Sequence, residues 1–454
     1  MIHSEKRQKV TQHRGAQTDD IADVLRAANQ KRLLGGSQEE LRAMERTPVA
    51  LFYDLDAFDD TLEALRAAFS PDANWRHCLA VKANPLLKML EMAVGKGFGL
   101  ECASLSEVEL SIKAQCCPSF IVYDSPCKTM NELRRALQLG VQINCDDFDE
   151  IDRVAKILLV EKLTSKSIIG VRINPLLGMG NIKALSVSDA TSKFGIPYND
   201  DNKAELIRCF QDYPFLNALH VHVGSQGCSL EMLAAGALTI YKFAEELGGP
   251  SRIKVLDIGG GLPTNFSSDE TNPTFAEYAK VLSKVCSPLF KPTSGYTCVT
   301  EFGRSIQAKV GWVASACELV KEAGGRRIAV VHVGSDMFVR TCYCPADFPL
   351  RVQVVDGTTF ILKDGDSMRE HNVVGPLCFG GDKICEGKLL PLINMDDFVV
   401  IRDSGANCLS LWSRHCSRLS PPVYGYRRGD ADNDITFQIL RAQETMENVL
   451  KFWE

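Results

Sequence analysis

The sequence has no long apolar run, no apolar leader and no excess of basic residues. No stretch approaches the roughly 18 consecutive apolar residues of a membrane-spanning helix, which argues against a membrane protein. The polar segment 1–20 lacks the apolar centre of a secretory signal, so we expect a disordered leader there, with a transit peptide as the alternative. The formal net charge of −6 argues against nucleic acid or an anionic membrane as the main partner.

The 17 cysteines of this 454-residue chain also lack any regular spacing. Such a pattern is typical of reduced thiols rather than a disulfide framework, so we predict a cytoplasmic protein. Cys342 and Cys344 follow His332 in "HVGSDMFVRTCYC", but this is not a standard zinc spacing. We therefore predict no metal site.

From residue 78 onward, short β-rich runs alternate with amphipathic helical segments such as 106–115, 128–140, 148–163 and 229–249. The β-rich runs are "CLAVKAN", "GFGLECAS", "SFIVYDS", "VQINCDD", "SIIGVRINP", "ALHVHVGS", "KVLDIGGG" and "TCVTEFGR". This alternation predicts βαβ units and a parallel sheet. Eight strands over about 225 residues favour a closed (β/α)8 barrel, with an open doubly wound sheet as the alternative.

After about residue 305 the pattern changes to turn-separated β runs with few helices. "AVVHVGS", "RVQVVDG", "TTFILKDG" and "DFVVIRDSG" predict antiparallel strands of an all-β domain, a sandwich or a barrel. We therefore expect an α/β barrel over 48–300 and a β domain formed by 21–47 and 301–454.

Chemically active residues gather where the predicted barrel strands end. Lys82 ends the first strand, His222 and Ser225 the sixth, and Glu301 and Arg304 the eighth, while the seventh runs into the triglycine 259–261. Each has an ordinary structural explanation, such as a turn, an ion pair or a lysine whose stem packs while its amine reaches water. Because the carboxyl ends of parallel strands meet at one face of a barrel, their coincidence predicts an active site.

This set of residues suits a ligand with a phosphate and a carbonyl group. Glycines let backbone N–H groups approach phosphate oxygens, and Arg304 and Ser225 would add charge and a hydroxyl. A partly desolvated lysine has a lowered pKa and can form a Schiff base, which is the role expected of Lys82. Pyridoxal phosphate combines both needs, with Glu301 as the acid partner of its ring nitrogen and His222 stacked on its ring.

The motifs "AVKAN", "GLECASLSEVEL", "RINP", "KFGI", "HVGSQ", "DIGGGLP", "EFGR" and "GPLC" occur in this order. In these motifs the chain, from about residue 48 to 430, resembles the fold-type III pyridoxal-phosphate decarboxylases. That family includes the ornithine, arginine and diaminopimelate decarboxylases, and the chain is nearer the diaminopimelate branch. The resemblance implies an alanine-racemase-like barrel with a β domain and an amino-acid substrate.

The resemblance also implies roles for individual residues. Lys82 would form the Schiff base, Glu301 would pair with the ring nitrogen, and His222 would stack on the ring. Glu101 and Arg172 would line the cofactor pocket. The phosphate would be held by Ser225, Gly259, Gly260, Gly261 and Arg304.

Family members form head-to-tail homodimers with two shared active sites, so a homodimer is implied here. Cys378 in "GPLC" matches the cysteine that reaches the site from the second subunit and returns a proton to the product. A tyrosine that touches the phosphate in the family is replaced here by Asn407.

The sequence departs from the family where substrates are distinguished. After the "GPLC" cysteine, ornithine decarboxylases carry Asp and diaminopimelate decarboxylases carry Glu, which binds a distal amine, whereas this chain has Phe379. Asp382 is close by, but its spacing fits a structural position as well. Arg340 fits an arginine that holds a distal carboxylate, with Tyr343 one residue short of its usual companion. His415, with Arg414 and Arg418, either receives an acidic substrate or solvates a loop.

These departures favour a decarboxylase for an amino acid with an acidic or neutral far end. The alternatives are standard diaminopimelate, ornithine or lysine decarboxylation, a racemase, and a catalytically silent regulatory homologue. Retention of Lys82, Cys378, Glu301 and the glycine turn argues against the silent homologue, and the "GPLC" motif argues against a racemase.

Overall fold

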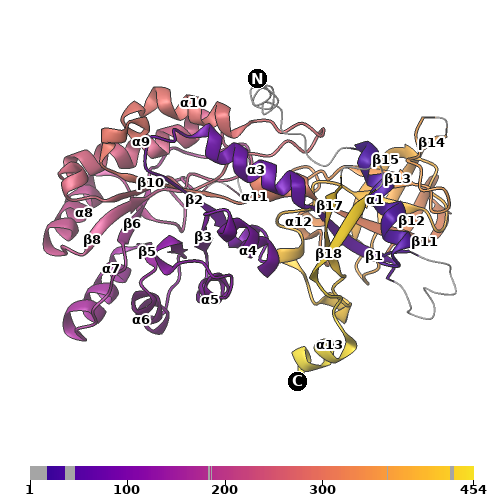
Figure 1. Cartoon of the computed structure of the whole chain (residues 1–454), viewed down its shortest axis with the longest axis horizontal. Helices are drawn as coiled ribbons and strands as arrows, with labels where there is room; N and C mark the ends of the chain where they lie inside the picture. The colour runs from indigo at the N-terminus through magenta and orange to yellow at the C-terminus, as the bar shows by residue number, and fades with distance from the viewer. Residues whose placement is uncertain (1–17, 36–46, 183–184, 186, 366, 430–433) are drawn as a thin grey trace. The chain divides into compact units, whose positions relative to one another are not determined.

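The structure is a computed structural model of the whole chain, and it describes residues 18–35, 47–182, 185, 187–365, 367–429 and 434–454. It divides into two compact units (Figure 1). The barrel unit comprises 62–264 and 272–306, and the β unit comprises the described residues up to 61 together with 265–271 and 307–454. No helix among the described residues is long and apolar enough to cross a membrane.

The barrel unit contains a closed ring of eight parallel strands. They are β2 (Trp75–Ala80), β3 (Gly99–Cys102), β4 (Ile121–Asp124), β5 (Gln142–Cys145), β6 (Ile169–Asn174), β8 (Leu216–His220), β9 (Val255–Asp257) and β10 (Thr297–Phe302). Each strand pairs in parallel with its neighbour, and the β10–β2 and β5–β6 pairings close the ring. The short β7 (Ile196–Pro197) adds to β6. The predicted (β/α)8 barrel is confirmed, and the open sheet is excluded.

Helices connect these strands, and their N-termini carry the caps that the sequence suggested. The helices are α4 (Leu87–Gly95), α5 (Leu105–Lys113), α6 (Met130–Leu139), α7 (Phe148–Ala155), α8 (Asp200–Asp212), α9 (Leu230–Glu246) and α10 (Phe275–Val285). Ser104 and Ser229 accept backbone N–H groups at the starts of α5 and α9, and Thr129 forms a capping box with Glu132. A π-helical turn, Lys156–Val160, continues α7.

The β unit is built on a second sheet with the order β15-β14-β12-β11-β1-β17-β18, and β16 joins β11 and β13. Its strands are β1 (Val49–Asp54), β11 (Gly311–Ala323), β12 (Arg326–Val331), β13 (Val352–Val355), β14 (Met368–Val374), β15 (Lys383–Pro391), β16 (Phe398–Ile401), β17 (Val423–Arg428) and β18 (Ile435–Arg441). Helices α1 (Thr18–Gln30), α12 (Val339–Tyr343) and α13 (Met446–Trp453) also belong to it, while α3 (Leu55–Ala68) crosses the boundary between the units.

The core of the β unit brings distant parts of the chain together. Val24 and Leu25 of α1 pack with Phe52 of β1 and Trp312 of β11 in one buried cluster. The rings of Phe52 and Trp312 are stacked, with centroids 4.5 Å apart. An apolar face of α1 therefore covers a sheet whose strands come from both ends of the sequence.

Several expectations for this region need correction. β1 pairs with β11 and β17, so the predicted start of the barrel at residue 48 is too early: "VALFYD" is apolar enough to suit either sheet. The run "TTFILKDG" is not a strand, because the Asp356 carboxylate accepts the N–H groups of Thr358 and Thr359 and forms a turn instead. The β1–β17 and β12–β14 pairings are parallel rather than antiparallel. Of the expected leader, 1–17 lie outside the described residues, and α1 begins at Thr18.

All 17 cysteines are free thiols in the structure, and many are buried. This agrees with the expectation that they do not form a disulfide framework.

A buried ion pair ties together the loops that follow β4 and β5. The Lys128 amine lies 2.8 Å from Oε1 of Glu150, and both side chains are almost fully buried. Lys128 also donates to the carbonyls of Ser125 and Asn144, at 2.7 and 3.0 Å. These bonds fix the carboxyl ends of two barrel strands.

Replacing Glu150 by alanine would leave the Lys128 charge buried without its counterion. We expect Glu150→Ala to lower the free energy of unfolding of the barrel unit by about 3–5 kcal/mol in urea. Glu91→Ala, which removes the exposed partner of Lys88, is the matched control and should cost less than about 1 kcal/mol. Equal losses in the two variants would show that carbonyl groups alone compensate the Lys128 charge.

Candidate active site

Lys82 lies in a single 3-10 turn, Val81–Ala83, directly after β2. Its amine donates to both oxygens of Glu101 in β3, at 2.7 and 2.9 Å. The Glu101 side chain is fully buried, whereas 49% of the Lys82 side chain is exposed. The amine thus lies at the carboxyl edge of the barrel, held by a buried carboxylate and open to a ligand.

The expected lowering of the Lys82 pKa is wrong. Desolvation lowers this pKa, but the neighbouring carboxyl groups, first Glu101 and then Asp124, outweigh it and raise the pKa above its ordinary value. Lys82 therefore stays an ammonium group while these carboxylates surround it. Its proton has to leave before the amine can act as a nucleophile, and the hydrogen-bonded Glu101 is the nearest acceptor.

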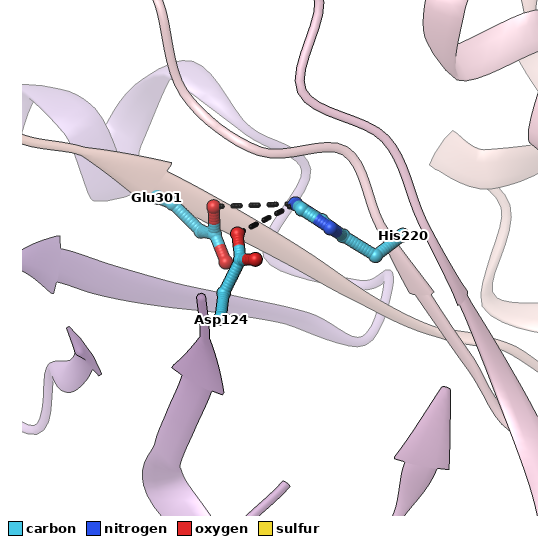
Figure 2. A group of neighbouring side chains, drawn as sticks. All are labelled: Asp124, His220 and Glu301. Carbon is cyan, nitrogen blue, oxygen red and sulfur yellow. Dashed lines mark ion pairs between the residues drawn. The ribbon is translucent and has the colours of Figure 1, made fainter. Parts of the chain in front are cut away.

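Four buried ionisable side chains lie in a row at the same edge of the barrel as Lys82. Arg172 of β6 donates to Oδ1 of Asp124, the last residue of β4, at 3.2 Å. Nε2 of His220, at the end of β8, lies 3.4 Å from Oδ2 of Asp124 and 3.5 Å from Oε2 of Glu301 in β10. Figure 2 shows the imidazole edge facing both carboxylates. Asp124, His220 and Glu301 each offer one atom that could bind a metal ion, and these three atoms all lie within 4.8 Å of one another.

The pKa values of the carboxyl groups at this edge of the barrel are shifted in opposite directions. Burial raises the pKa of Asp124, but the neighbouring side chains, first Arg172 and then His220 and Lys82, outweigh it and hold the pKa below its usual range. Burial, followed by the charges of Glu101 and Asp124, raises the pKa of Glu301 well above its usual range. Asp257, at the end of β9, also has a strongly raised pKa, first through burial and then through the charge of Glu301. Asp124 is thus a stable anion, whereas Glu301 readily holds a proton.

The triglycine turn follows β9 and packs tightly against neighbouring backbone. A Cβ atom on Gly260 would collide with the Glu301 carbonyl, and one on Gly261 with the Gly224 carbonyl. Gly261 also has a φ of 101°, which other residues rarely adopt. The Gly260 N–H donates to Nδ1 of His222 at 3.2 Å, which leaves the proton of that imidazole on Nε2.

The other predicted phosphate contacts of the barrel unit lie at the same edge. Ser225 is in the loop after β8, and its N–H donates to the Leu185 carbonyl. Arg304, 9% exposed, begins the short helix α11 (Arg304–Gln307) directly after β10. The structure therefore brings together the barrel residues that the sequence singled out: Lys82, Glu101, Arg172, His222, Ser225, Gly259, Gly260, Gly261, Glu301 and Arg304.

The remaining predicted residues belong to the β unit. Phe379 follows the exposed thiol of Cys378 and stacks on Tyr343 of α12, with ring centroids 5.2 Å apart and an interplanar angle of 15°. Both rings are partly open to solvent, with 37% and 64% of each residue exposed. Asn407 has a φ of 56°, and it lies in the loop after β16.

The cationic stretch around His415 is partly neutralised. Arg414 forms an ion pair with Glu444 at 2.7 Å and lies over the ring of Phe452. Arg418 lies 4.0 Å from the buried carboxylate of Asp336. Of this stretch, His415 is exposed.

Sequence reasoning missed Asp124, His220 and Asp257. Each is the last residue of its strand, in "IVYD", "LNALH" and "VLD", and all three are buried. The signal used for Lys82 and Glu301, a polar residue at the carboxyl end of an apolar strand, would have found them.

Residues 55–308 match the family model described as "Pyridoxal-dependent decarboxylase, pyridoxal binding domain". The chain belongs to this family. It is therefore a carboxy-lyase with pyridoxal phosphate as its cofactor, and the predicted family, enzyme class and cofactor are confirmed.

The relatives that the chain resembles carry related names. It is 27% identical to a diaminopimelate decarboxylase of Helicobacter pylori over 90% of this chain and 96% of the relative. It is 28% identical to that of Zymomonas mobilis over 75% and 77%. The crystal structure of the Helicobacter pylori enzyme complexed with L-lysine has a TM-score of 0.76 at 24% identity, covering 92% and 99%. A viral arginine decarboxylase, from Paramecium bursaria Chlorella virus, has a TM-score of 0.70 at 20% identity, covering 86% and 98%.

The barrel edge fits pyridoxal phosphate on its own geometry. The Lys82 amine is accessible. The three glycines of the turn carry no side chain that would block the approach of a phosphate to their backbone N–H groups. Oε1 of Glu301 is buried and receives no hydrogen bond from an amide, hydroxyl or cationic group among the described residues; its neighbour is the Asp257 carboxyl, so it remains suited to pair with a ring nitrogen.

Lys82→Ala should abolish the visible absorbance of the Schiff base when the protein is mixed with pyridoxal phosphate, and CO2 release should fall to background. Lys88→Ala, which removes an exposed amine of α4, is the control and should keep both. A Schiff-base band that survives in Lys82→Ala would contradict the assignment of this lysine.

Proposed function

We propose that the enzyme releases CO2 from an amino acid whose far end carries a carboxylate or no charge. The observation that carries this proposal is the aromatic pair of Phe379 and Tyr343 beside Cys378. An aromatic pair offers apolar surface but no carboxylate that could form an ion pair with a distal ammonium.

Asp382 does not supply the missing negative charge. It is 3% exposed, and its two oxygens accept the N–H groups of Ser335 and Leu377 at 2.5 and 2.7 Å. A Cβ atom at Gly334 or Gly375 would collide with its carboxylate. Asp382 therefore joins two loops of the β unit, which supports its structural interpretation.

Arg340 is the group that suits a distal carboxylate. It lies in α12 with Tyr343, and its guanidinium lies over the ring of Phe348 at 5.5 Å. Its buried Nη1 has no hydrogen-bond partner among the described residues. A guanidinium with an unused N–H is well matched to a carboxylate, which accepts charge-assisted hydrogen bonds.

We infer the roles of the barrel residues from the geometry of the barrel edge and from the family resemblance, and those of Cys378 and Asn407 from the resemblance alone. When bound, the cofactor supplies an electron sink for the electron pair that CO2 leaves behind. Lys82 binds the cofactor and exchanges its proton with Glu101, Glu301 holds a proton at the ring nitrogen, and His222 covers the ring. The thiol of Cys378 returns a proton to the substrate Cα. Ser225, Arg304, Asn407 and the triglycine turn hold the phosphate.

Diaminopimelate is the second candidate substrate. The relatives that align with 90% or more of this chain are named diaminopimelate decarboxylases. Diaminopimelate also has a distal carboxylate for Arg340, but its distal ammonium would face the aromatic pair.

A panel of L- and D-amino acids assayed for CO2 release distinguishes these substrates. We expect dicarboxylic or neutral amino acids to be decarboxylated and lysine and ornithine to be poor substrates. Phe379→Asp should raise kcat/KM for lysine or ornithine about 10- to 100-fold, because it adds one charge-assisted hydrogen bond. Phe379→Leu is the control and should not. Efficient turnover of diaminopimelate or lysine by the unaltered enzyme would overturn the proposal.

We also infer that the enzyme is a cytoplasmic homodimer with shared active sites. The free thiols suit a reducing compartment, and the family resemblance places Cys378 in the site of the second subunit.

Mixing two inactive variants tests the shared sites. Lys82→Ala and Cys378→Ala subunits should each be nearly inactive, whereas their remixed dimers should recover about a quarter of the unaltered activity, since half of the dimers are mixed and one of their two sites is intact. No recovery in mixtures that exchange subunits would show that Lys82 and Cys378 act within one subunit.

A further inference from the structure

We propose that His220, through its Nε2 edge, is a positioning residue that holds Glu301 ready to share a proton with the cofactor ring nitrogen. This inference rests on the proposed placement of Glu301 at that nitrogen. It concerns a buried histidine that does not itself touch the cofactor aldehyde or the substrate.

The geometry gives His220 one edge for two carboxyl groups. Its Nε2 lies 3.4 Å from Asp124 and 3.5 Å from Glu301, at the ends of different strands. His220 is fully buried, and the edge of its ring faces the carboxyl groups of both Asp124 and Glu301 (Figure 2). Nε2 is thus near both carboxyl groups at once, where a proton on it would limit the movement of the Glu301 carboxyl group.

The surroundings of the ring decide which nitrogen carries the proton. Both ring nitrogens are buried and neither makes a hydrogen bond among the described residues, but carboxyl oxygens lie 3.4 and 3.5 Å from Nε2. A buried N–H without an acceptor costs more than a buried lone pair without a donor, which disfavours a proton at Nδ1. The Nε2–H form, in contrast, points its hydrogen at two carboxyl oxygens.

Asp124 fixes the direction of this hydrogen. The guanidinium of Arg172 donates to its other oxygen, and Arg172 also lies 3.7 Å from Asp146. The Asp124 carboxylate therefore has a cation on one side and the imidazole edge, 3.4 Å away, on the other. The order Arg172, Asp124, His220, Glu301 is a fixed chain from β6 to β10.

Glu301, at the end of that row of side chains, is the group that can gain or lose a proton. Without cofactor, burial and the charges of Glu101 and Asp124 favour its protonated form. When Glu301 gives the proton from Oε1 to the ring nitrogen, it becomes a carboxylate, and the His220 N–H donates to its Oε2. The proton moves between two sites with no other reactant, and the imidazole N–H stabilises the charged product.

The same three side chains have the composition of a metal site, but their neighbours argue for a shared proton. Arg172 contacts Asp124 directly, and the Lys82 ammonium lies among the same carboxylates. Two fixed cations next to the cluster oppose the binding of a divalent cation.

The first test uses the cofactor-free protein, labelled with 15N-histidine. Long-range proton–nitrogen correlation spectra distinguish the two neutral tautomers and the imidazolium, and His220→Gln identifies the signals of His220 by their loss. We expect a proton on Nε2 at pH 7. A ring that carries its proton on Nδ1 alone would overturn the proposal, and so would a stoichiometric change of these signals on adding Zn²⁺, which would make the cluster a metal site.

The second test measures the ring nitrogen itself in protein loaded with ring-15N pyridoxal phosphate. Gln places an amide N–H near the position of Nε2, so His220→Gln should keep the protonated-nitrogen signal of the unaltered protein. His220→Leu fills the space without a donor and should lose most of that signal and lower kcat with little change in KM. Equal signals in the Gln and Leu variants would show that His220 only fills space.

Glu301→Gln separates this inference from the function on which it rests. If the ring-nitrogen signal is unchanged in Glu301→Gln, then Glu301 does not contact the ring nitrogen, and the proposed placement of Glu301 fails first. If that variant loses the signal while His220→Leu keeps it, only the role of His220 is overturned.

Discussion

The active face of this enzyme depends on a balance of buried charge. Glu101, Asp124, Asp257 and Glu301 are almost completely excluded from solvent at the carboxyl ends of barrel strands. The cations that face them there are Lys82 and Arg172. Carboxylates in such a place are stable as anions only where a cation contacts them, so the remaining groups must retain protons. The site therefore stores protons before any ligand binds.

This balance assigns a state to each group by its neighbours. Asp124 contacts Arg172 and is an anion, whereas Asp257 receives hydrogen bonds from Gln142 and the Gly259 backbone and has no cation in contact among the described residues. Lys82 is held as an ammonium by the carboxylates of Glu101 and Asp124. Nucleophilic chemistry at Lys82 thus begins with a proton transfer, and the acceptor is already hydrogen-bonded to it.

The sequence was sufficient for the barrel because its signals are local. Eight apolar strands alternate with helical segments along the chain, and parallel strands bring their ends to one face without further information. The β unit depends on long-range pairing instead: β1 lies between strands that follow it by some 260 and 370 residues. Hydrophobic periodicity and composition alone do not reveal which strands pair with β1. They also do not reveal the turn that Asp356 forms at the start of "TTFILKDG". The direction of the Lys82 pKa shift was predicted wrongly for the same reason, because Asp124 and Glu301 are far from Lys82 in sequence.

The charge balance also constrains which substrates can be accommodated. A carboxylate brought against Glu101, Asp124 or Glu301 would add to a surplus of negative charge, so an acidic far end must be received elsewhere. The β unit offers Arg340 with an unpartnered Nη1, together with the uncharged rings of Tyr343 and Phe379. Asp382, the acid nearest to that aromatic pair in sequence, is occupied by backbone N–H groups. In the barrel unit, carboxylates control protons, whereas the β unit, taken by itself, presents the guanidinium of Arg340 and the stacked rings of Tyr343 and Phe379.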